Sequence, residues 1–293
     1  MRLVSLPTNS SAHRATVKRR WRDGVTFFCR SGVLLAGLAL CVSFATAADA
    51  PKLGITGTAT DDAVSKPYPT ALLRSGASFM ATHLQAQQAD DDLNPGMLWV
   101  DQGRERFAAD CAGCHDGASQ QRLASSLPRV DRSGAVQTLE TQINVCQTSR
   151  LQRPTYPIES APLLALSSYL AFSARGEMQR LSSDVVRSNA WKRGRDAFTR
   201  VQGRLDFSCA ACHDKMAGKR VRTQAISQGH GVGFPAYRVE WQGVGSLNRR
   251  LRACYFGMET GVPAASDPAL LDLELYLAWR SEGLPIEAPA VRR

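Results

Sequence analysis

Two thiols and an imidazole stand together in the segment Cys209-Ala-Ala-Cys212-His213. Cysteines at this spacing can form two thioether bonds to the edge of a porphyrin, and the adjacent histidine can supply an axial nitrogen to its iron. Forty-one residues beyond that histidine lies Cys254, at the end of a segment with three arginines. The segment predicts a helix, because the residues at offsets of three, four and seven share one face: Leu247, Arg250, Leu251 and Cys254. A thiol among arginines, one domain's length after a haem histidine, indicates that something anionic reacts at it.

A second copy of the attachment motif occurs at Cys111-Ala-Gly-Cys114-His115. A single C-x-x-C-H motif could be accidental or a redox dithiol, but two in an exported chain favour covalent haem c at both places. We therefore expect two haems, attached through Cys111, Cys114, Cys209 and Cys212, with His115 and His213 as axial ligands.

Two of the eight cysteines, Cys146 and Cys254, lie outside these motifs and outside the N-terminal leader described below. They occupy equivalent positions, thirty-one and forty-one residues beyond their own haem histidines. A disulfide between them is one interpretation in an oxidising compartment. Their equivalence favours another, in which each is the sixth ligand of its own iron, because matching sites of two domains normally lie further apart than the ~7 Å between Cα atoms that a disulfide tolerates. Met258 is the rival ligand in the second copy, and the first copy has no counterpart to it.

The two motifs belong to an internal repeat. Each is preceded by a glycine and a phenylalanine four residues apart, and each copy ends in a stretch rich in Leu and Tyr. The paired segments are Gly103 to Phe107 with residues 163–171, and Gly194 to Phe198 with residues 270–278. This arrangement resembles the crossed terminal helices of class I cytochromes c, where the glycine lets two backbones approach closely. The sequence thus predicts a mainly α protein with two tandem class I cytochrome c-like domains, at residues 96–180 and 181–293.

Arginines distinguish the second copy from the first around the spare cysteine. Aligned on the cysteines, the first copy has Glu140, Thr141, Gln142 and Asn144 where the second has Asn248, Arg249, Arg250 and Arg252. Guanidinium groups bind tetrahedral oxyanions and favour thiolate over thiol. A solvated basic face is the alternative, but the excess is confined to one copy. We therefore predict Cys254 and Arg250 as catalytic residues, with Arg249 and Arg252 helping Arg250 to bind an anionic substrate.

The first 48 residues predict a signal for export to the periplasm. Basic residues precede an apolar run at 33–44, which is too short to span a membrane, and Ala45-Thr46-Ala47 offers a cleavage site. The whole chain has 36 Lys and Arg against 26 Asp and Glu, a net charge of +10. Seven of the bases and one of the acids lie in the first 47 residues, which leaves +4 for the remainder. A charge this small gives no reason to expect a nucleic-acid partner.

Residues 49–95 are rich in Ala, Ser, Asp and Gln and contain four prolines. This composition predicts a mostly irregular N-terminal arm with a short helix around Ser78–Gln88. His83 in that helix could ligate iron, but we expect a histidine facing solvent.

Several stretches of the chain resemble SoxA, the dihaem cytochrome c family of the bacterial sulfur-oxidising Sox system. They are Arg74-Ser75-Gly76, Leu84 to Asp92, Asn94-Pro95-Gly96, Leu98-Trp99-Val100, Ile143 to Cys146, the helix with Tyr169 and Gly176, and Leu251 to Cys254. The resemblance implies an L-cysteine S-thiosulfotransferase subunit that acts with a monohaem cytochrome partner (SoxX). The pair would join thiosulfate oxidatively to a cysteine of a carrier protein (SoxYZ), with an acceptor cytochrome c taking the electrons. The resemblance also implies that Cys254 is both haem ligand and reactive centre and that Arg250 faces it. Glu259-Thr260 departs from the more basic pattern of many members.

Two other functions fit the same motifs. A dihaem electron carrier of the c4 class would need the haems but not the arginines around Cys254. A dihaem peroxidase fits the motifs less well than either, since such an enzyme needs an open or displaceable position on iron.

Overall fold

Helices form most of the structure, a computed structural model that describes residues 65–221 and 224–293. The predicted leader at 1–48 and the first part of the predicted arm, 49–64, lie outside the described residues. The helices are η1 (Thr70–Leu72), η2 (Gly76–Phe79), α1 (Thr82–Ala89), α2 (Met97–Asp110), α3 (Gly117–Ser125), α4 (Leu139–Ser149), α5 (Ala161–Ser173), η3 (Val185–Arg187), α6 (Asn189–Thr199), α7 (Cys209–His213), α8 (Leu247–Gly257) and α9 (Pro268–Ser281). The strands are β1 (Arg129–Val130), β2 (Val136–Gln137), β3 (Arg220–Val221), β4 (Gln224–Ala225), β5 (Ala236–Arg238), β6 (Gly243–Gly245) and β7 (Ala290–Arg292). The prediction of a mainly α protein is confirmed.

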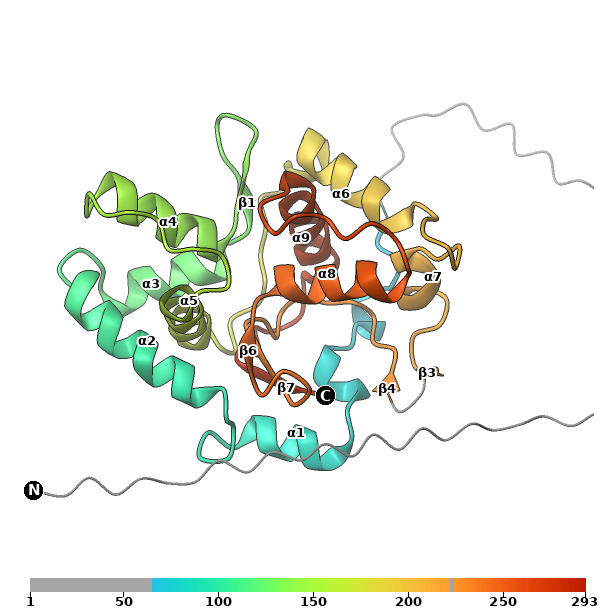
Figure 1. Cartoon of the computed structure of the whole chain (residues 1–293), viewed down its shortest axis with the longest axis horizontal. Helices are drawn as coiled ribbons and strands as arrows, with labels where there is room; N and C mark the ends of the chain where they lie inside the picture. The colour runs from blue at the N-terminus through green and yellow to red at the C-terminus, as the bar shows by residue number, and fades with distance from the viewer. Residues whose placement is uncertain (1–64, 222–223) are drawn as a thin grey trace, which may run out of the picture. The chain divides into compact units, whose positions relative to one another are not determined.

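The first and last helices of each copy cross at the predicted glycine (Figure 1). In the first copy α2 packs against α5, and a Cβ atom on Gly103 would lie 2.0 Å from the backbone oxygen of Ala165. In the second copy α6 packs against α9, and a Cβ atom on Gly194 would lie 2.1 Å from the backbone oxygen of Asp272. No side chain fits at either crossing, so only glycine allows the two backbones to approach this closely.

The helices that carry the spare cysteines each begin at a side-chain cap. Thr138 and Thr141 form a capping box at the start of α4, and the side chain of Ser246 accepts a hydrogen bond from the backbone N–H of Arg249 at the start of α8. The apolar face of α8 points inward, where Leu251 is buried in the core around α6 and α9. Burial of this face orients the rest of α8, including the arginines and Cys254.

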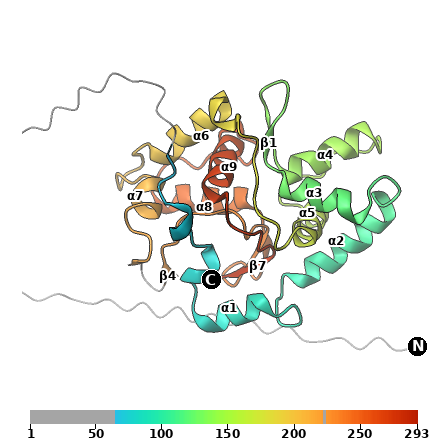
Figure 2. The ribbon, with the colours of Figure 1, turned by 180° about the vertical axis from the view of Figure 1, so that it is seen from behind.

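Each copy has its own core, yet segments of one copy also pack on the other. Phe107 and Ile143 belong to the core of the first copy, and Trp191 and Phe198 to that of the second. Val136, on the hairpin of β1 and β2 in the first copy, is buried in the second core. Figures 1 and 2 show α2 to α5 on one side of the described structure and α6 to α9 on the other.

Three small sheets were not predicted from the sequence. Two are two-stranded hairpins, and the third has the order β6-β5-β7, with β5 antiparallel to β6 and parallel to the C-terminal strand β7. Strands of two or three residues are too short to show an alternating pattern in sequence. The third sheet places Arg238 at the end of β5.

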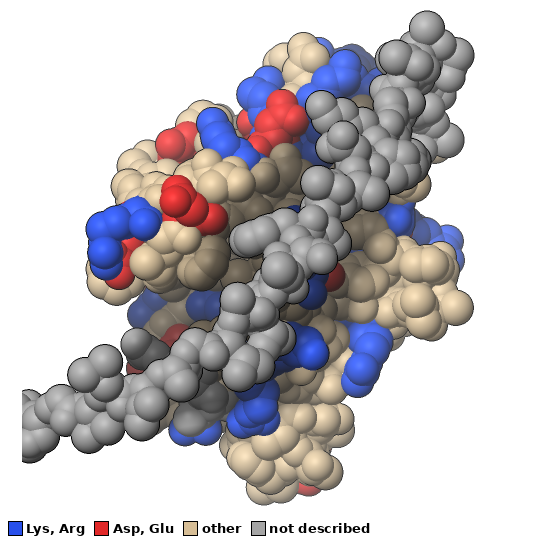
Figure 3. Space-filling view, turned by 90° about the vertical axis from the view of Figure 1, so that its right-hand side faces the viewer, with Lys and Arg blue, Asp and Glu red and all other residues tan. Residues whose placement is uncertain are grey.

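The N-terminal arm contains the expected short helix in two pieces. The predicted helix over Ser78–Gln88 is η2 followed by α1, and His83 on α1 is exposed, as predicted. The structure gives no helix in the described ranges that is long and apolar enough to cross a membrane. On the face in Figure 3, Lys and Arg are spread over the described surface and Asp and Glu are fewer.

Candidate active site around Cys254

The second attachment motif forms a short helix, α7, whose histidine is held in one orientation. Ser208 caps α7 by accepting a hydrogen bond from the backbone N–H of Ala211 at 3.0 Å. The Nδ1 atom of His213 lies 2.8 Å from the carbonyl oxygen of Ser227. Since a carbonyl only accepts, Nδ1 carries the proton and Nε2 keeps its lone pair for a metal. Gly229, at a φ of +75°, lies against the ring, where a Cβ atom would be 2.9 Å from His213 Cγ.

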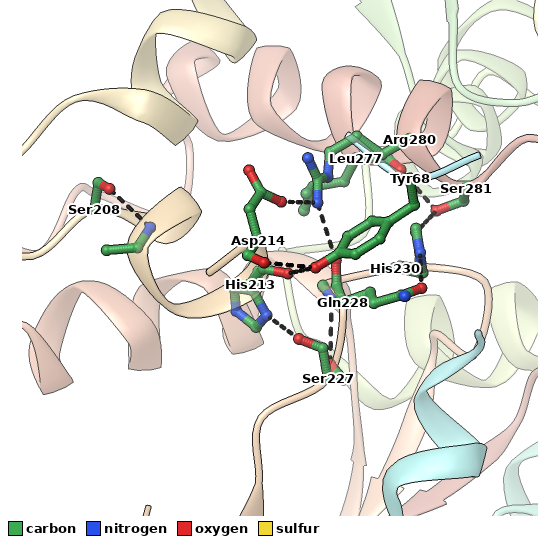
Figure 4. A network of polar contacts seen from close by, with 12 residues as sticks. Tyr68, Ser208, His213, Asp214, Ser227, Gln228, His230, Leu277, Arg280 and Ser281 are labelled. Atoms are coloured by element: carbon green, nitrogen blue, oxygen red, sulfur yellow. Dashed lines mark hydrogen bonds and ion pairs between the residues drawn. The ribbon is translucent and has the colours of Figure 1, made fainter. Parts of the chain in front are cut away.

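A buried arginine lies beside this motif (Figure 4). Arg280 on α9 is 1% exposed and donates through Nη2 to Asp214 Oδ1 at 2.5 Å and to the carbonyl oxygen of Gln228 at 3.2 Å. Its guanidinium lies 4.3 Å from the centre of the Phe198 ring. Its Nε and Nη1 atoms have no hydrogen-bond partner among the residues that the structure describes. A buried cation with two unpaired donors near Cys209 fits an anionic group such as a haem propionate.

Two further residues near α7 were missed in the sequence. The hydroxyl of Tyr68 donates to the carbonyl oxygens of His213 at 2.8 Å and Asp214 at 2.9 Å, so the N-terminal arm braces the end of the motif (Figure 4). His230 is buried, and its ring nitrogens face Gln228 Oε1 at 3.2 Å and Ser281 Oγ at 3.3 Å. Burial, with the charge of Arg280 adding to it, lowers the pKa of His230 to about 3.

Cys254 faces His213 across the space beside the motif. Its thiol interacts with the imidazole by a hydrogen bond and lies close enough to Cys209 and Cys212 to raise the pKa of both, although burial is the larger cause for each. Burial also raises the pKa of Cys254 itself, but Arg250, His213 and Arg238 oppose it and bring that pKa down to about 7. Cys254 as a residue is partly buried, and the positive charge around its sulfur favours the thiolate.

Two arginines supply the positive charge at this thiol. Arg250, one turn before Cys254 on α8, is the main group that lowers the thiol pKa, as the sequence predicted from their spacing. Its guanidinium makes no hydrogen bond or ion pair with any residue that the structure describes. Arg238, which sequence analysis missed, approaches from β5, is buried, and is held by Glu240 at 2.7 Å. Burial and the neighbouring Arg250 both lower the pKa of Arg238.

The other two predicted arginines have partners elsewhere. Arg249 lies 4.3 Å from the centre of the Trp241 ring, and its Nη1 is 4.0 Å from Glu159 Oε2. Arg252 donates through Nε to the carbonyl oxygen of Pro263 at 3.0 Å. The free donors next to the thiol therefore belong to Arg250.

The first copy repeats the arrangement without the charge. Cys146 lies near Cys111, whose pKa rises to about 11 through burial, then through Asp110 and Cys146. Gln142, which matches Arg250, places its Nε2 3.8 Å from Cys146 Sγ and accepts a hydrogen bond from Arg129 at 3.0 Å. The ring of His115 is 6.4 Å from that of Phe107, and the matching distance between His213 and Phe198 is also 6.4 Å. The two copies therefore share this arrangement of histidine and phenylalanine and differ in the electrostatics at the thiol.

No disulfide links the six cysteines that the structure describes. Each spare cysteine lies with the motif of its own copy, as the position equivalence predicted. Met258, the rival ligand, is buried and caps the C-terminus of α8, one turn beyond Cys254. The thiols, the oriented His213 and the unpaired donors of Arg280 together fit a covalently attached haem in the second copy.

Comparison with known proteins agrees with this site. Fold and site define a c-type cytochrome, and the family model of the SoxA/TsdA cytochrome c domain matches residues 97–178. The L-cysteine S-thiosulfotransferase subunit SoxA of Pseudaminobacter salicylatoxidans is 32% identical over 75% of this chain and 80% of the relative. SoxA of Paracoccus pantotrophus is 30% identical over 89% of this chain and 97% of the relative. The crystal structure of SoxXA from P. pantotrophus has a chain that aligns with a TM-score of 0.71 at 30% identity, over 75% of this chain and 86% of that one. The chain belongs to the SoxA family.

Proposed function

We propose that this chain is the dihaem cytochrome subunit of an L-cysteine S-thiosulfotransferase, which conjugates thiosulfate oxidatively to a cysteine of a carrier protein. The names of its relatives support this activity. The observation that carries the proposal is the guanidinium of Arg250, unpaired among the described residues, beside the thiol of Cys254, whose pKa it lowers. An unpaired cation next to an activated sulfur suits a dianionic sulfur substrate and has no use in a simple electron carrier.

Each copy would hold one haem in its own cytochrome c-like domain, at residues 96–180 and 181–293. Cys111 and Cys114 would attach the first haem, and Cys209 and Cys212 the second. His115 with Cys146, and His213 with Cys254, would be the axial ligand pairs. When bound, the second haem would take up electrons from the sulfur chemistry. Its anionic thiolate ligand would stabilise the ferric state of the iron.

Arg250 and Arg238 would bind thiosulfate at Cys254. Arg250 would offer its unpaired N–H groups to the sulfonate oxygens, while the buried Arg238 would add positive charge near the thiol. Arg249 and Arg252, held by Trp241 and Pro263, would contribute to the field at the entrance rather than to direct contacts. The exposed ion pair of Arg204 with Glu259 lies at the end of α8 and would moderate the positive charge there.

The sulfur chemistry at Cys254 would proceed in two steps. The Cys254 thiolate would join the outer (sulfane) sulfur of thiosulfate to give a Cys254–S–S–sulfonate adduct. The two electrons released would be taken up one at a time by cytochrome c acceptors. A carrier thiolate then attacks the sulfane sulfur, the Sγ–S bond breaks, and the Cys254 thiolate is regenerated as leaving group. The carrier leaves as a cysteine S-thiosulfonate, and the single proton from its thiol goes to solvent. A pKa near 7 makes Cys254 both a good nucleophile and a good leaving group.

We infer the partners from the relatives. A monohaem cytochrome subunit would pair with this chain, because the P. pantotrophus structure that it resembles is that of SoxXA. A SoxYZ-like carrier would deliver the acceptor cysteine, and a soluble cytochrome c would receive the electrons. The periplasm would be the site of this assembly, in keeping with the leader predicted at residues 1–48.

Replacement of each spare cysteine by alanine, in separate variants, tests the proposal. With carrier protein and monohaem partner supplied, Cys254→Ala should abolish thiosulfate-dependent reduction of an acceptor cytochrome, whereas Cys146→Ala should retain most of it. Intact mass of the exported protein should show two haems in the wild type and both variants, since the thioether cysteines are unchanged. Equal loss of activity in the two variants would favour a plain electron carrier instead.

A further inference from the structure

A cavity of ≈ 360 Å³ lies apart from the Cys254 site, between α4, α8, α9 and the loop before α5. Much of its wall is apolar, formed by Leu163, Leu164 and Leu271, with the half-exposed Val145 and Ile158 among its lining residues. Cys254 and the haem-attachment cysteines do not line it. The cavity is therefore separate from the site described above, although α8 borders both.

Three carboxylates line this apolar cavity. They come from separate elements: Glu140 from the first turn of α4, Glu159 from the loop before α5, and Glu274 from the middle of α9. Glu274 is 8% exposed. The three groups lie close enough to affect one another: burial raises the pKa of Glu274, and the charges of Glu140 and Glu159 raise it further. Burial likewise raises the pKa of Glu140, with Glu159 adding to the effect.

The carboxylates have almost no positive charge to compensate them. Within the described part of the chain, neither Glu140 nor Glu274 forms an ion pair, and Arg249 is 4.0 Å from Glu159 Oε2. Other lining groups are unpaired acceptors too. Asn248 is 8% exposed and donates through Nδ2 to the carbonyl oxygen of Ala265. Among the described residues its Oδ1 has no hydrogen-bond partner, and Glu159 Oε2 has none beyond the long contact with Arg249. Hydroxyl groups such as that of Thr138, which hydrogen-bonds Glu140, also line the cavity. Among the described residues, however, the two buried oxygens lack a hydrogen-bond donor, and positive charge reaches the carboxylates only at the 4.0 Å contact with Arg249.

These features select the class of ligand. Unpaired acceptors and uncompensated carboxylates call for a cation with N–H groups, and the leucine walls call for an apolar body attached to it. A bare metal ion fits poorly, because the described residues include no group of three side chains close enough to coordinate one. An alkylammonium ion is larger and needs only hydrogen-bond acceptors around its head, which these more widely spaced carboxylates supply. The volume corresponds to roughly twelve water molecules at ~30 Å³ each, enough for a short alkyl chain with its charged head.

We propose that this cavity binds a small alkylammonium ion, with its charged nitrogen among Glu140, Glu159 and Glu274 and its chain against Leu163, Leu164 and Leu271. Asn248 Oδ1 accepts one of the N–H groups. Glu159 also accepts a hydrogen bond from the backbone N–H of Ser246, the residue that caps α8, at 3.2 Å. A bound cation therefore stabilises the junction between the loop before α5 and the start of α8.

Calorimetric titration of the full holoprotein with n-pentylamine tests this binding. Ammonium chloride supplies the charge without the chain, and n-pentanol supplies the chain without the charge. We expect n-pentylamine to bind and to raise the melting temperature, and both partial probes to bind at least about tenfold more weakly, since a charged hydrogen bond and chain burial each contribute about that factor. Equal binding of n-pentanol would mean an apolar void only and would overturn the proposal, as would absence of n-pentylamine binding.

Matched variants locate the site. Glu274→Gln should weaken n-pentylamine binding about tenfold, and Glu105→Gln, an exposed glutamate on α2 outside the cavity, should leave it unchanged. Glu140→Gln, at the partly exposed start of α4, provides a second cavity variant if Glu274→Gln does not fold. Unchanged affinity in a folded cavity variant, or equal losses in it and in Glu105→Gln, would place the amine elsewhere. None of these measurements depends on thiosulfate chemistry, so their outcome is separate from that of the proposed function.

Discussion

Replacement of Arg250 by alanine separates a sulfur-transfer enzyme from an electron carrier. The guanidinium has no hydrogen bond or ion pair with the described residues, so its removal breaks no internal contact, and the variant should fold with both haems. What it loses is a charge-assisted contact to a partly desolvated dianion. Such a contact contributes about 1.5–3 kcal/mol, which corresponds to a roughly ten- to hundredfold lower kcat/KM for thiosulfate.

The remaining charge limits the loss. Arg238 still supplies positive charge near the thiol of Cys254, so activity should fall without vanishing. Arg250→Lys keeps the charge but not the planar fork of donors and should fall between the wild type and Arg250→Ala. The matched control is Gln142→Ala, which removes the side chain at the same position of the first copy and should change the rate little.

The assay is thiosulfate-dependent reduction of an acceptor cytochrome c, with the carrier and the monohaem partner in excess. A parallel redox titration of each variant checks that the haem potentials have not moved enough to explain the rate. Full activity without Arg250, or an equal loss in Gln142→Ala, would refute the assignment of Arg250 to substrate binding.

Three further predictions concern stability and the haem environment. Gly103→Ala and Gly194→Ala should each destabilise the protein by about 1–3 kcal/mol in denaturant unfolding, because their Cβ atoms would overlap a backbone oxygen, and Gly117→Ala, with open space around it, should not. His230 has a folded-state pKa of about 3, below its ordinary 6.5, so stability should fall as the pH drops from 6.5 towards 3, by up to about 1.4 kcal/mol per unit. His230→Gln should remove that slope, and a variant that keeps it would show that another group titrates. Arg280→Gln should lower the reduction potential of the second haem alone in spectroelectrochemical titration, since a buried positive charge favours the reduced form. It should also lower the free energy of unfolding by about 1–3 kcal/mol. Equal shifts of potential at both haems would contradict a local role for Arg280.

The local chemistry of this protein was readable from the chain. The C-x-x-C-H motifs, the glycines at the helix crossings and the spacing of Arg250 and Cys254 all act over a few residues, and the repeat doubled each signal. Position equivalence then placed Cys146 and Cys254 in separate copies, and the structure agrees, with each near its own motif. Periodicity and spacing suffice where a helix alone decides which side chains share a face.

Tertiary structure decided which charges meet the thiol. Arg249, Arg250 and Arg252 are neighbours in sequence, but packing of Leu251 orients α8 so that Arg249 meets Trp241 and Arg252 meets Pro263. Of the three, Arg250 therefore keeps its donors free beside Cys254. Arg238 reaches the same thiol from a three-residue strand that has no sequence signature. The same holds for Tyr68 and Arg280 around α7, and for the three carboxylates that meet between α4, α8 and α9. Such groups come from distant segments, and no local pattern records them, because only the burial of the intervening helices brings them together.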